Sequence, residues 1–205
     1  MDRRQFIKSG SLGLATTFMG QTNAFASSPT EKRIYNAVKW TMIKNDLPVL
    51  DKFKMSKDVG FDGVSLMAPG WFEVKEVLQA IDKTELPVHN VNDANHWKVR
   101  LSDPDPAVRK QAEQDLRDTI QFASDVGADS ILLVVGKVTD PIHENHDQVW
   151  ERSTEIIKDT LPLAARLGVR ILLENVGNDF CLTPDLWNKY IDQFESPWIG
   201  AFFDI

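Results

Sequence analysis

Short apolar segments alternate with longer amphipathic segments along most of the chain. The apolar segments have the length and the Val, Ile, Leu and Phe content of buried strands, whereas the amphipathic segments repeat with a helical period. The predicted strands are Ala37–Ile43, Gly63–Met67, Pro87–Val91, Ser130–Val135, Val169–Glu174 and Ile199–Asp204. The predicted helices are Leu47–Val59, Trp71–Lys83, Pro106–Gly127, Gln148–Leu167 and Pro184–Phe194. This alternation predicts an α/β fold with a parallel sheet.

The residues at the predicted boundaries support this division. Asp105 precedes Pro106 and Thr183 precedes Pro184, and both pairs are typical of the first residues of a helix. Glycines such as Gly168 stand where a helix must end before the next strand begins. The repeated unit is therefore a strand followed by a helix.

The order of strands and helices fits both a doubly wound sheet and a barrel. A dinucleotide-binding sheet needs a glycine-rich turn after its first strand, and residues 41–45 contain no glycine. We therefore favour a (β/α)8 TIM barrel. Such a barrel has eight strand–helix units and about 250 residues. Because the sequence ends on the sixth predicted strand, we expect an incomplete barrel of about six strands and five helices, a fragment that is inactive alone.

Two carboxylates follow buried strands at equivalent places. Glu174 ends the apolar run of residues 169–173, and Asp204 ends the run of residues 199–203. Side chains at the carboxyl ends of barrel strands point into the mouth of the barrel, where active sites lie. An unpaired carboxylate inside the sheet would be very costly. The pair therefore indicates a metal site.

The first residues indicate export. Arg3 and Arg4 precede a mildly apolar stretch over residues 9–20 and then Ala24-Phe25-Ala26, which resembles a twin-arginine signal peptide. We expect cleavage after Ala26, a linker over residues 27–33 and the barrel over residues 34–205. The apolar stretch is shorter than the roughly 18 residues that span a bilayer, which argues against a stable membrane anchor. The predicted location is the periplasm or exterior of a bacterium, with the twin-arginine translocation machinery as a partner.

Charge excludes one class of partner. Removal of residues 1–26 takes three of the 23 basic and one of the 30 acidic side chains, which leaves a net charge of −9. No cluster of Lys and Arg is present, so a surface that follows nucleic-acid phosphates is not expected. Cys181 is the only cysteine, so the chain cannot form an internal disulfide.

Several segments carry a family resemblance. They are Trp40-Thr41-Met42-Ile43, Gly60-Phe61-Asp62-Gly63-Val64, Asn95-His96-Trp97, Leu101-Ser102-Asp103-Pro104, Glu174-Asn175-Val176-Gly177-Asn178, and Ser196-Pro197-Trp198 through Phe203-Asp204-Ile205. From about residue 34 onward the chain resembles the sugar phosphate isomerase/epimerase family, whose fold is the xylose-isomerase-like TIM barrel. The Glu-Asn and Phe-Asp strand ends are the most specific part of this resemblance.

The resemblance implies a role for each carboxylate. Glu174 matches the family's first metal-ligand glutamate, which also acts as catalytic acid/base, and Asp204 matches the second metal ligand. A histidine and a second catalytic glutamate would come from later strands. The implied reaction is metal-dependent isomerisation or epimerisation of a sugar or sugar phosphate, by proton abstraction beside a carbonyl through an enediolate. Mn²⁺, Mg²⁺ or Co²⁺ suits such ligands, with Zn²⁺ as the alternative. The oligomeric state of the full-length protein stays open.

Four other side chains are candidates for sugar binding. His89 is expected at the end of its strand, facing the substrate or held as a structural histidine. His96 and Trp97 follow that strand and could form a wall on which a sugar stacks, or pack within the loop. Asn178 could bond a hydroxyl, with a turn as its alternative role.

Two further features bear on metal and substrate. His143 and His146 have the spacing of a metal pair, but we interpret their polar segment as a solvated loop. Ser65 stands where many relatives carry a glutamate, and Gly177 stands where some carry a tryptophan, so the substrate is expected to differ.

Two other functions compete with an isomerase. One is an inosose-type dehydratase on the same barrel, in which proton abstraction leads to loss of water. The other is a sugar-binding or degenerate barrel without catalysis. A DNA-repair endonuclease on this barrel is disfavoured by the acidic charge and the export signal.

Overall fold

The computed structural model describes residues 34–44 and 46–203. The predicted signal peptide and linker, and Asp204, lie outside this part of the chain. The elements are β1 Ala37–Lys39, the 3₁₀ helix η1 Trp40–Met42, α1 Val49–Asp58, β2 Gly63–Ala68, α2 Val74–Thr84, β3 Val88–Asp93, α3 Pro106–Asp125, β4 Ser130–Leu133, α4 His146–Leu167, β5 Arg170–Glu174, α5 Pro184–Asp192 and β6 Ile199–Phe202.

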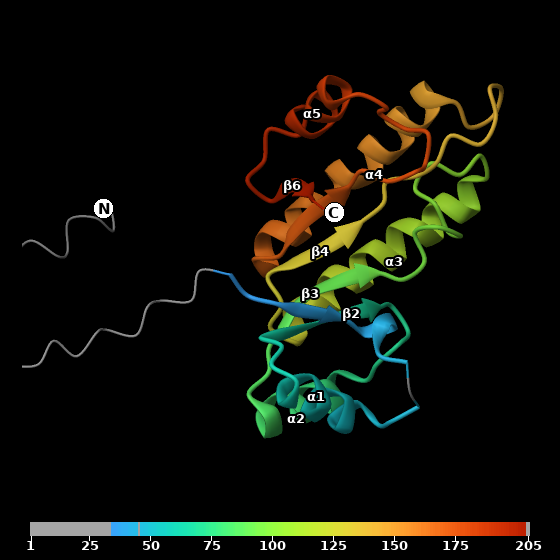
Figure 1. Cartoon of the computed structure of the whole chain (residues 1–205). Helices are drawn as coiled ribbons and strands as arrows, with labels where there is room; N and C mark the ends of the chain where they lie inside the picture. Colours follow the sequence, from blue (N-terminus) through green and yellow to red (C-terminus); the bar gives the residue numbers. More distant parts are fainter. Residues whose placement is uncertain (1–33, 45, 204–205) are drawn as a thin grey trace, which may run out of the picture. The chain divides into compact units, whose positions relative to one another are not determined.

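The six strands form one parallel sheet in the order β1-β2-β3-β4-β5-β6, with helices on its outer side (Figure 1). Each strand pairs with the next strand in the sequence, as in a TIM barrel. The sheet is strongly curved, because Ala37 of β1 and Phe202 of β6 line one pocket although four strands separate them. The prediction of an incomplete α/β barrel with six strands and five α-helices is confirmed.

Each strand has a boundary that differs from the prediction by one to four residues, and two of these differences affect the site. β1 ends at Lys39, and the next three residues form η1 instead of continuing the strand to Ile43. The cause is a tertiary contact, because the Trp40 ring turns into the core and meets Phe72 edge-on at 4.9 Å. β3 instead continues past Val91 as far as Asp93.

The helix boundaries follow the predicted signals. The Asp105 carboxylate accepts a hydrogen bond from the Ala107 N–H at 2.8 Å, and the Thr183 hydroxyl accepts one from the Leu186 N–H at 3.3 Å. Both contacts satisfy N–H groups that have no partner within the helix. At the other end of α4, Gly168 takes the left-handed conformation with φ 72°. Such a conformation favours glycine.

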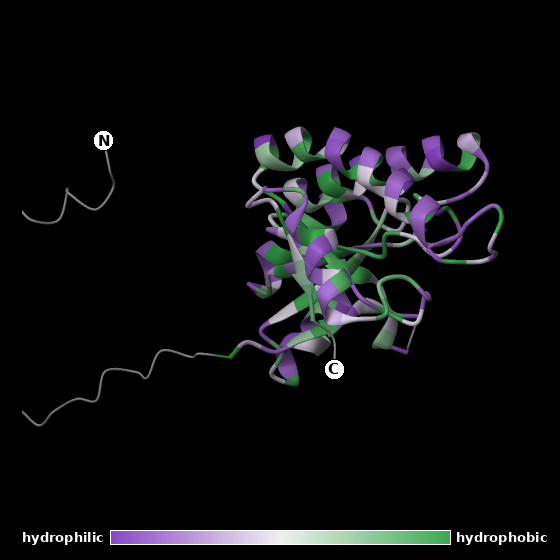
Figure 2. Cartoon of the chain, turned by 90° about the horizontal axis from the view of Figure 1, so that it is seen from above, coloured by the Kyte–Doolittle hydropathy of each residue, from purple (hydrophilic) through white to green (hydrophobic). Residues whose placement is uncertain are grey.

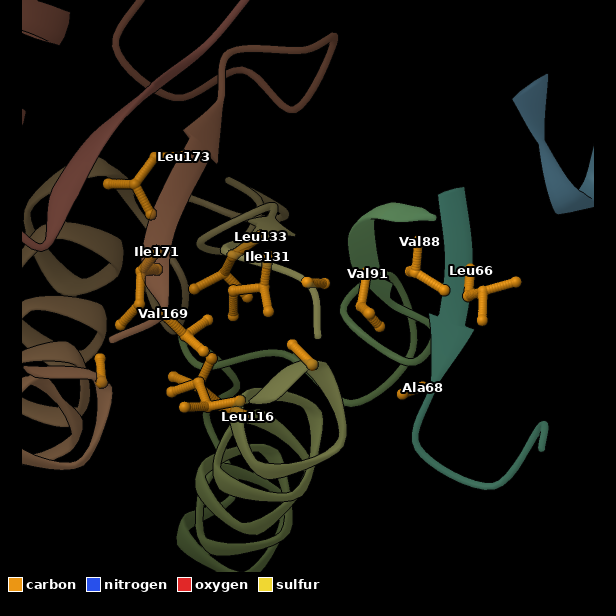
Figure 3. Close-up of a cluster of buried hydrophobic side chains, with 14 of the residues drawn as sticks. Leu66, Ala68, Val88, Val91, Leu116, Ile131, Leu133, Val169, Ile171 and Leu173 are labelled. Carbon is orange, nitrogen blue, oxygen red and sulfur yellow. The ribbon is translucent and has the colours of Figure 1, made fainter. Parts of the chain in front are cut away.

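The hydrophobic core lies between the outer face of the sheet and the helices. Alternate residues of each strand point to this layer, and Figure 3 shows a cluster of them beside Leu116 of α3. The labelled members are Leu66, Ala68, Val88, Val91, Ile131, Leu133, Val169, Ile171 and Leu173. Figure 2 shows the polar residues on the outer faces of the helices. Within the described ranges, no helix is long and apolar enough to cross a membrane.

Candidate active site

The inner face of the curved sheet carries a pocket of about 270 Å³. Because side chains alternate along a strand, the residues that do not reach the helix layer point into this space. The residues of β1–β3 that line it are Ala37, Lys39, Ser65, His89, Asn90 and Asn92. Leu132 of β4 and Phe202 of β6 line it from the other side. Tyr35 and Met42, which flank β1, complete the lining, so the polar side chains of the strands come from β1–β3 and the residues of β4 and β6 are apolar.

A chain of hydrogen bonds orders the polar half. The Asn92 amide donates to the Ser65 hydroxyl at 3.0 Å and to the Leu66 carbonyl at 3.2 Å. The Asn90 amide in turn lies 3.5 Å from the Asn92 side-chain oxygen. Asn90 and Asn92 are both almost fully buried. The network fixes amide and hydroxyl groups on the floor of the pocket, where they suit a ligand rich in hydroxyls.

Glu174 is the last residue of β5. It follows Leu173, which points to the helix layer, so alternation directs the carboxylate to the inner face. Its exposed fraction is only 9%. Glu174 pairs with Phe202 of β6, two residues before Asp204. The carboxyl end of β5 therefore carries a buried acid beside the strand that leads to the second predicted acid.

The donor chemistry at this edge fits a hard divalent cation. Carboxylate oxygens are ligands that Mg²⁺ and Mn²⁺ prefer. In residues 34–44 and 46–203, no three His, Cys, Asp or Glu side chains are grouped so as to hold a metal ion. Of the two predicted ligands, Glu174 and Asp204, the structure describes Glu174 alone. Both ligand assignments stay predictions.

His96 and Trp97 lie in the loop after β3. The backbone N–H of Val134, just after β4, donates to His96 Nδ1 at 3.4 Å, so Nε2 carries the hydrogen of the neutral ring. Burial, and secondarily the nearby charge of Lys39, lowers the pKa of His96 to about 4. The Trp97 ring meets His96 edge-on at 5.7 Å and is 46% exposed. The structure thus brings a neutral histidine donor and an accessible aromatic ring together.

The other two predicted sugar ligands are His89, within β3, and Asn178, in the loop after β5. The expected place of His89 at a strand end is wrong, because β3 continues to Asp93 and His89 is its second residue. His89 nevertheless lines the pocket with an exposed side chain. Asn178 is 1% exposed, donates to the Gly136 carbonyl at 2.8 Å and accepts from the Phe180 N–H at 3.3 Å. Sugar binding by His89 and Asn178 stays a prediction.

A buried ion pair joins the loops after β3 and β4. The Arg100 guanidinium donates from Nε and Nη2 to the two Glu144 carboxylate oxygens, each at 2.9 Å. The Ser102 and Thr139 hydroxyls donate to the same carboxylate at 2.6 Å. Burial alone would raise the pKa of Glu144, but the three donors together hold it below its ordinary value. This cluster, Arg100-Ser102-Thr139-Glu144, is called the loop clamp below.

Close packing continues around the loop clamp. Gly136 has φ 154°, and a Cβ atom there would collide with the Ser102 side chain. The Asn178 backbone carbonyl accepts from the Val138 N–H at 3.0 Å. The loops after β3, β4 and β5 are therefore held to one another at the mouth of the barrel.

The segment that holds His143 and His146 differs from the solvated loop that the sequence suggested. His146 begins α4, and its ring lies 5.0 Å from Phe180 and 5.9 Å from Trp150. Between the two histidines, Glu144 is fully buried in the loop clamp. Only His143 has the exposed side chain that was expected.

Another buried acid lies on the face of β3 opposite the pocket. Asp93 is 3% exposed and accepts a hydrogen bond from the Asn95 N–H at 2.9 Å. Burial, with a smaller contribution from the negative charge of Asp115, raises the pKa of Asp93 to about 7. Its hydrogen bond shapes the loop that carries His96, so Asp93 supports the site from outside the pocket.

Lys39, Asn90 and Asn92 were missed as candidates from the sequence. Lys39 lies two residues after Ala37 and therefore faces the same side of β1, which is the signal that the sequence offers. Because the predicted strand continued to Ile43, Lys39 was not recognised as a strand end. The asparagines were missed because β3 contains a bulge. Val64 pairs with Val88 and Ser65 pairs with Asn90, so His89 is an additional residue that shifts the alternation.

Comparison with known proteins places this geometry in a family. Residues 53–205 match the family model described as xylose isomerase-like TIM barrel. The chain belongs to the xylose isomerase-like TIM barrel family. It is also 25% identical over 167 residues to L-ribulose-5-phosphate 3-epimerase UlaE of Escherichia coli strain K12, a match that covers 76% of this chain. The chain spans 58% of the length of that relative.

Two solved structures of sugar epimerases have a similar fold. 3-Keto-D-glucoside 4-epimerase YcjR from E. coli has a TM-score of 0.66 at 18% identity, over 82% of this chain and 68% of its own. D-Psicose 3-epimerase from Clostridium cellulolyticum H10 has a TM-score of 0.70 at 17% identity, over 82% of this chain and 62% of its own. At these identities the likeness shows the fold alone.

Proposed function

We propose that the full-length protein is a sugar isomerase or epimerase that abstracts a proton beside a carbonyl. The observation that carries this proposal is Glu174, a buried carboxylate at the carboxyl end of β5 on the inner face of the barrel. In TIM barrels this edge of the sheet holds the catalytic groups. The epimerase names of the family relatives support the same reaction class.

Glu174 acts in this proposal as both a base and a ligand. Its carboxylate takes the proton from the carbon next to the carbonyl, which leaves an enediolate. In an epimerisation, a second glutamate from outside the described residues would give a proton to the opposite face of the same carbon. Substrate is held against it by the amide and hydroxyl groups of Asn90, Asn92 and Ser65. Trp97 covers one side of the sugar and excludes water.

A divalent metal ion belongs to the same proposal. Glu174 and Asp204 would hold it, and Mn²⁺, Mg²⁺ or Co²⁺ suits their oxygen ligands. When bound, the metal supplies positive charge that stabilises the enediolate oxygen atoms formed by proton removal. Further ligands would come from outside the described residues.

Solvent exchange tests the proposal directly. The full-length protein, supplied with Mn²⁺ or Mg²⁺, is incubated with a panel of ketoses in D₂O, and the products are followed by ¹H NMR. We expect deuterium at the carbon beside the carbonyl together with an epimeric or isomeric sugar, and loss of both after metal chelation. A product that has lost water would replace this proposal with a dehydratase. Binding without exchange across the panel would favour a non-catalytic barrel.

We also propose that the protein is exported by the twin-arginine route and acts on a sugar without phosphate, because phosphorylated sugars are mainly cytoplasmic. The support is the arginine pair and apolar stretch of residues 1–26, which lie outside the described residues. A fusion of residues 1–33 to a reporter that is active only after folded export tests the route. Replacing Arg3 and Arg4 by Lys should abolish export. Undiminished export of that variant would contradict the proposal.

A further inference from the structure

Lys39 is a cation on the inner face of the barrel, and no acidic side chain among residues 34–44 and 46–203 forms an ion pair with it. It is the last residue of β1, pairs with Ser65 of β2 and lines the pocket. Its side chain is half-buried. In the part of the chain that the structure describes, it has no ion pair and no hydrogen bond to another side chain. Its positive charge nevertheless acts on a neighbouring side chain, because it helps to lower the pKa of His96.

The surroundings of Lys39 do not neutralise its charge. The other described residues that line the pocket include amides, a hydroxyl and a histidine, and none of them is Asp or Glu. The neighbouring His96 is neutral at pH 7 because its pKa is about 4. The β1–β3 half of the pocket therefore combines one positive charge with groups that bind hydroxyls. An anion bound there gains more from the lysine than it would in water, because the pocket walls exclude solvent.

We propose that the pocket selects a sugar acid, with Lys39 binding the substrate carboxylate. This inference rests on the proposed isomerase or epimerase function. In the sheet, three strands separate β1 from β5. Lys39 and Glu174 would thus contact opposite ends of one substrate, the carboxylate at Lys39 and the reacting carbon near Glu174.

A carboxylate fits the pocket better than a phosphate. The described residues that line the pocket supply one lysine charge, which matches a carboxylate, whereas a phosphate ester carries about −1.5 to −2 at pH 7. Proteins commonly bind phosphate through the N–H groups at the start of an α-helix. The segment after β1 is only the three-residue helix η1. No arginine lines the pocket to grip a phosphate with two hydrogen bonds.

Three ligands with the same carbon skeleton test the proposal. D-Gluconate, D-glucitol and D-glucitol 6-phosphate differ in whether the chain carries a carboxylate, only hydroxyls or a phosphate. Their affinities for the full-length protein are measured by calorimetry after dialysis removes metal ions, so that a carboxylate–metal contact makes no contribution. The variants are Lys39→Met, Lys39→Arg and Lys44→Met, a control that removes an exposed lysine outside the pocket. Circular dichroism establishes that each variant is folded.

For the wild type we expect gluconate to bind about tenfold more tightly than glucitol, the ratio that one charge-assisted hydrogen bond provides. Lys39→Met should remove this preference, whereas Lys39→Arg and Lys44→Met should keep it. Equal affinities in the wild type, a preference for the phosphate, or a preference for gluconate that survives in Lys39→Met would each overturn the proposal.

The solvent-exchange experiment separates the two proposals. A preference for gluconate that depends on Lys39, without exchange on any sugar, would refute the isomerase function and leave the anion site standing. Exchange on neutral ketoses with no preference for gluconate would support the isomerase function and refute the anion site.

Discussion

The two halves of the barrel's inner face have different chemistry, although their outer faces are alike. On the outer face, Leu66 of β2 and Leu133 of β4 are equally buried beneath helices. On the inner face, β1–β3 present Lys39 and a hydrogen-bonded group of amides, whereas β4–β6 present Leu132, Phe202 and the terminal Glu174. The outer residues therefore stabilise the fold, and the inner residues are available for function.

The contrast indicates that the two halves have separate roles, one in binding the substrate and the other in the reaction. The β1–β3 half has amide and hydroxyl groups and a lysine, and no described acid lines the pocket there. The β4–β6 half has Leu132 and Phe202 and, at the end of β5, Glu174, which the proposed function uses as the base. Binding and chemistry should then respond to different substitutions.

Glu174→Gln should have the largest effect, and it should reduce catalysis while leaving substrate binding almost unchanged. Loss of the carboxylate removes the base, so deuterium uptake from solvent should fall by about 10²- to 10⁴-fold. Affinity for D-glucitol, measured by calorimetry without metal, should change little because the β1–β3 half is intact. Glu151→Gln, on an exposed part of α4, serves as the control. A Glu174→Gln variant with near-normal exchange would remove Glu174 from the mechanism.

Glu144→Gln should loosen the connection between the two halves. The substitution removes the charge that Arg100 and two hydroxyls surround, and breaking a buried ion pair costs about 4 kcal/mol. The free energy of unfolding in urea should fall by that order. The control is Glu113→Gln, which breaks the more exposed Glu113–Arg117 pair on α3 and should cost about 0.5 kcal/mol. Similar losses in the two variants would show that the loop clamp is dispensable.

Asp93→Asn should change how the free energy of unfolding depends on pH. The pKa of Asp93 is about 7 in the folded protein, above its ordinary value of 3.8. Folding therefore favours the protonated acid, and the free energy of unfolding should decrease as pH rises from about 4 to 7. At roughly 1.4 kcal/mol per pKa unit, the contribution between pH 5 and pH 8 is about 3 kcal/mol.

Urea unfolding at pH 5 and pH 8 measures this effect. Asp93→Asn should remove most of the decrease that the wild type shows, because the amide does not titrate. Asp118→Asn, an exposed acid on α3, should leave the decrease in place. An unchanged decrease in Asp93→Asn would mean that another group causes it.

Trp97→Ala should produce the smallest effect and should affect binding alone. Loss of an exposed aromatic face costs about 1 kcal/mol, so KM should rise about fivefold while kcat stays constant. The matched control is Trp71→Ala, which removes a similarly exposed tryptophan from the loop between β2 and α2. A fall in kcat with constant KM would place Trp97 in the chemistry instead.

The pattern of apolar residues was sufficient for the fold and for part of the site. It predicted the existence of each strand and α-helix, and it placed Glu174 at a strand end, because burial of alternate residues is a local property. It did not reveal that the Trp40 ring ends β1 by packing on Phe72. That contact joins segments distant in the sequence.

The same limit explains the errors in the site. Glu144 lies in a polar segment and was expected to be solvated, yet Arg100, 44 residues earlier, makes its burial favourable. The bulge at His89 likewise depends on pairing with β2. Asp204 lies outside the described residues, so its role as a metal ligand stays a prediction.

The loop clamp also bears on how the protein unfolds. Its carboxylate comes from the loop after β4, whereas Arg100 and Ser102 come from the loop after β3. If either loop opened alone, it would leave a buried charge without its partner. Opening of the third and fourth strand–helix units should therefore be cooperative, so that native-state fluctuations expose the amides of both loops together.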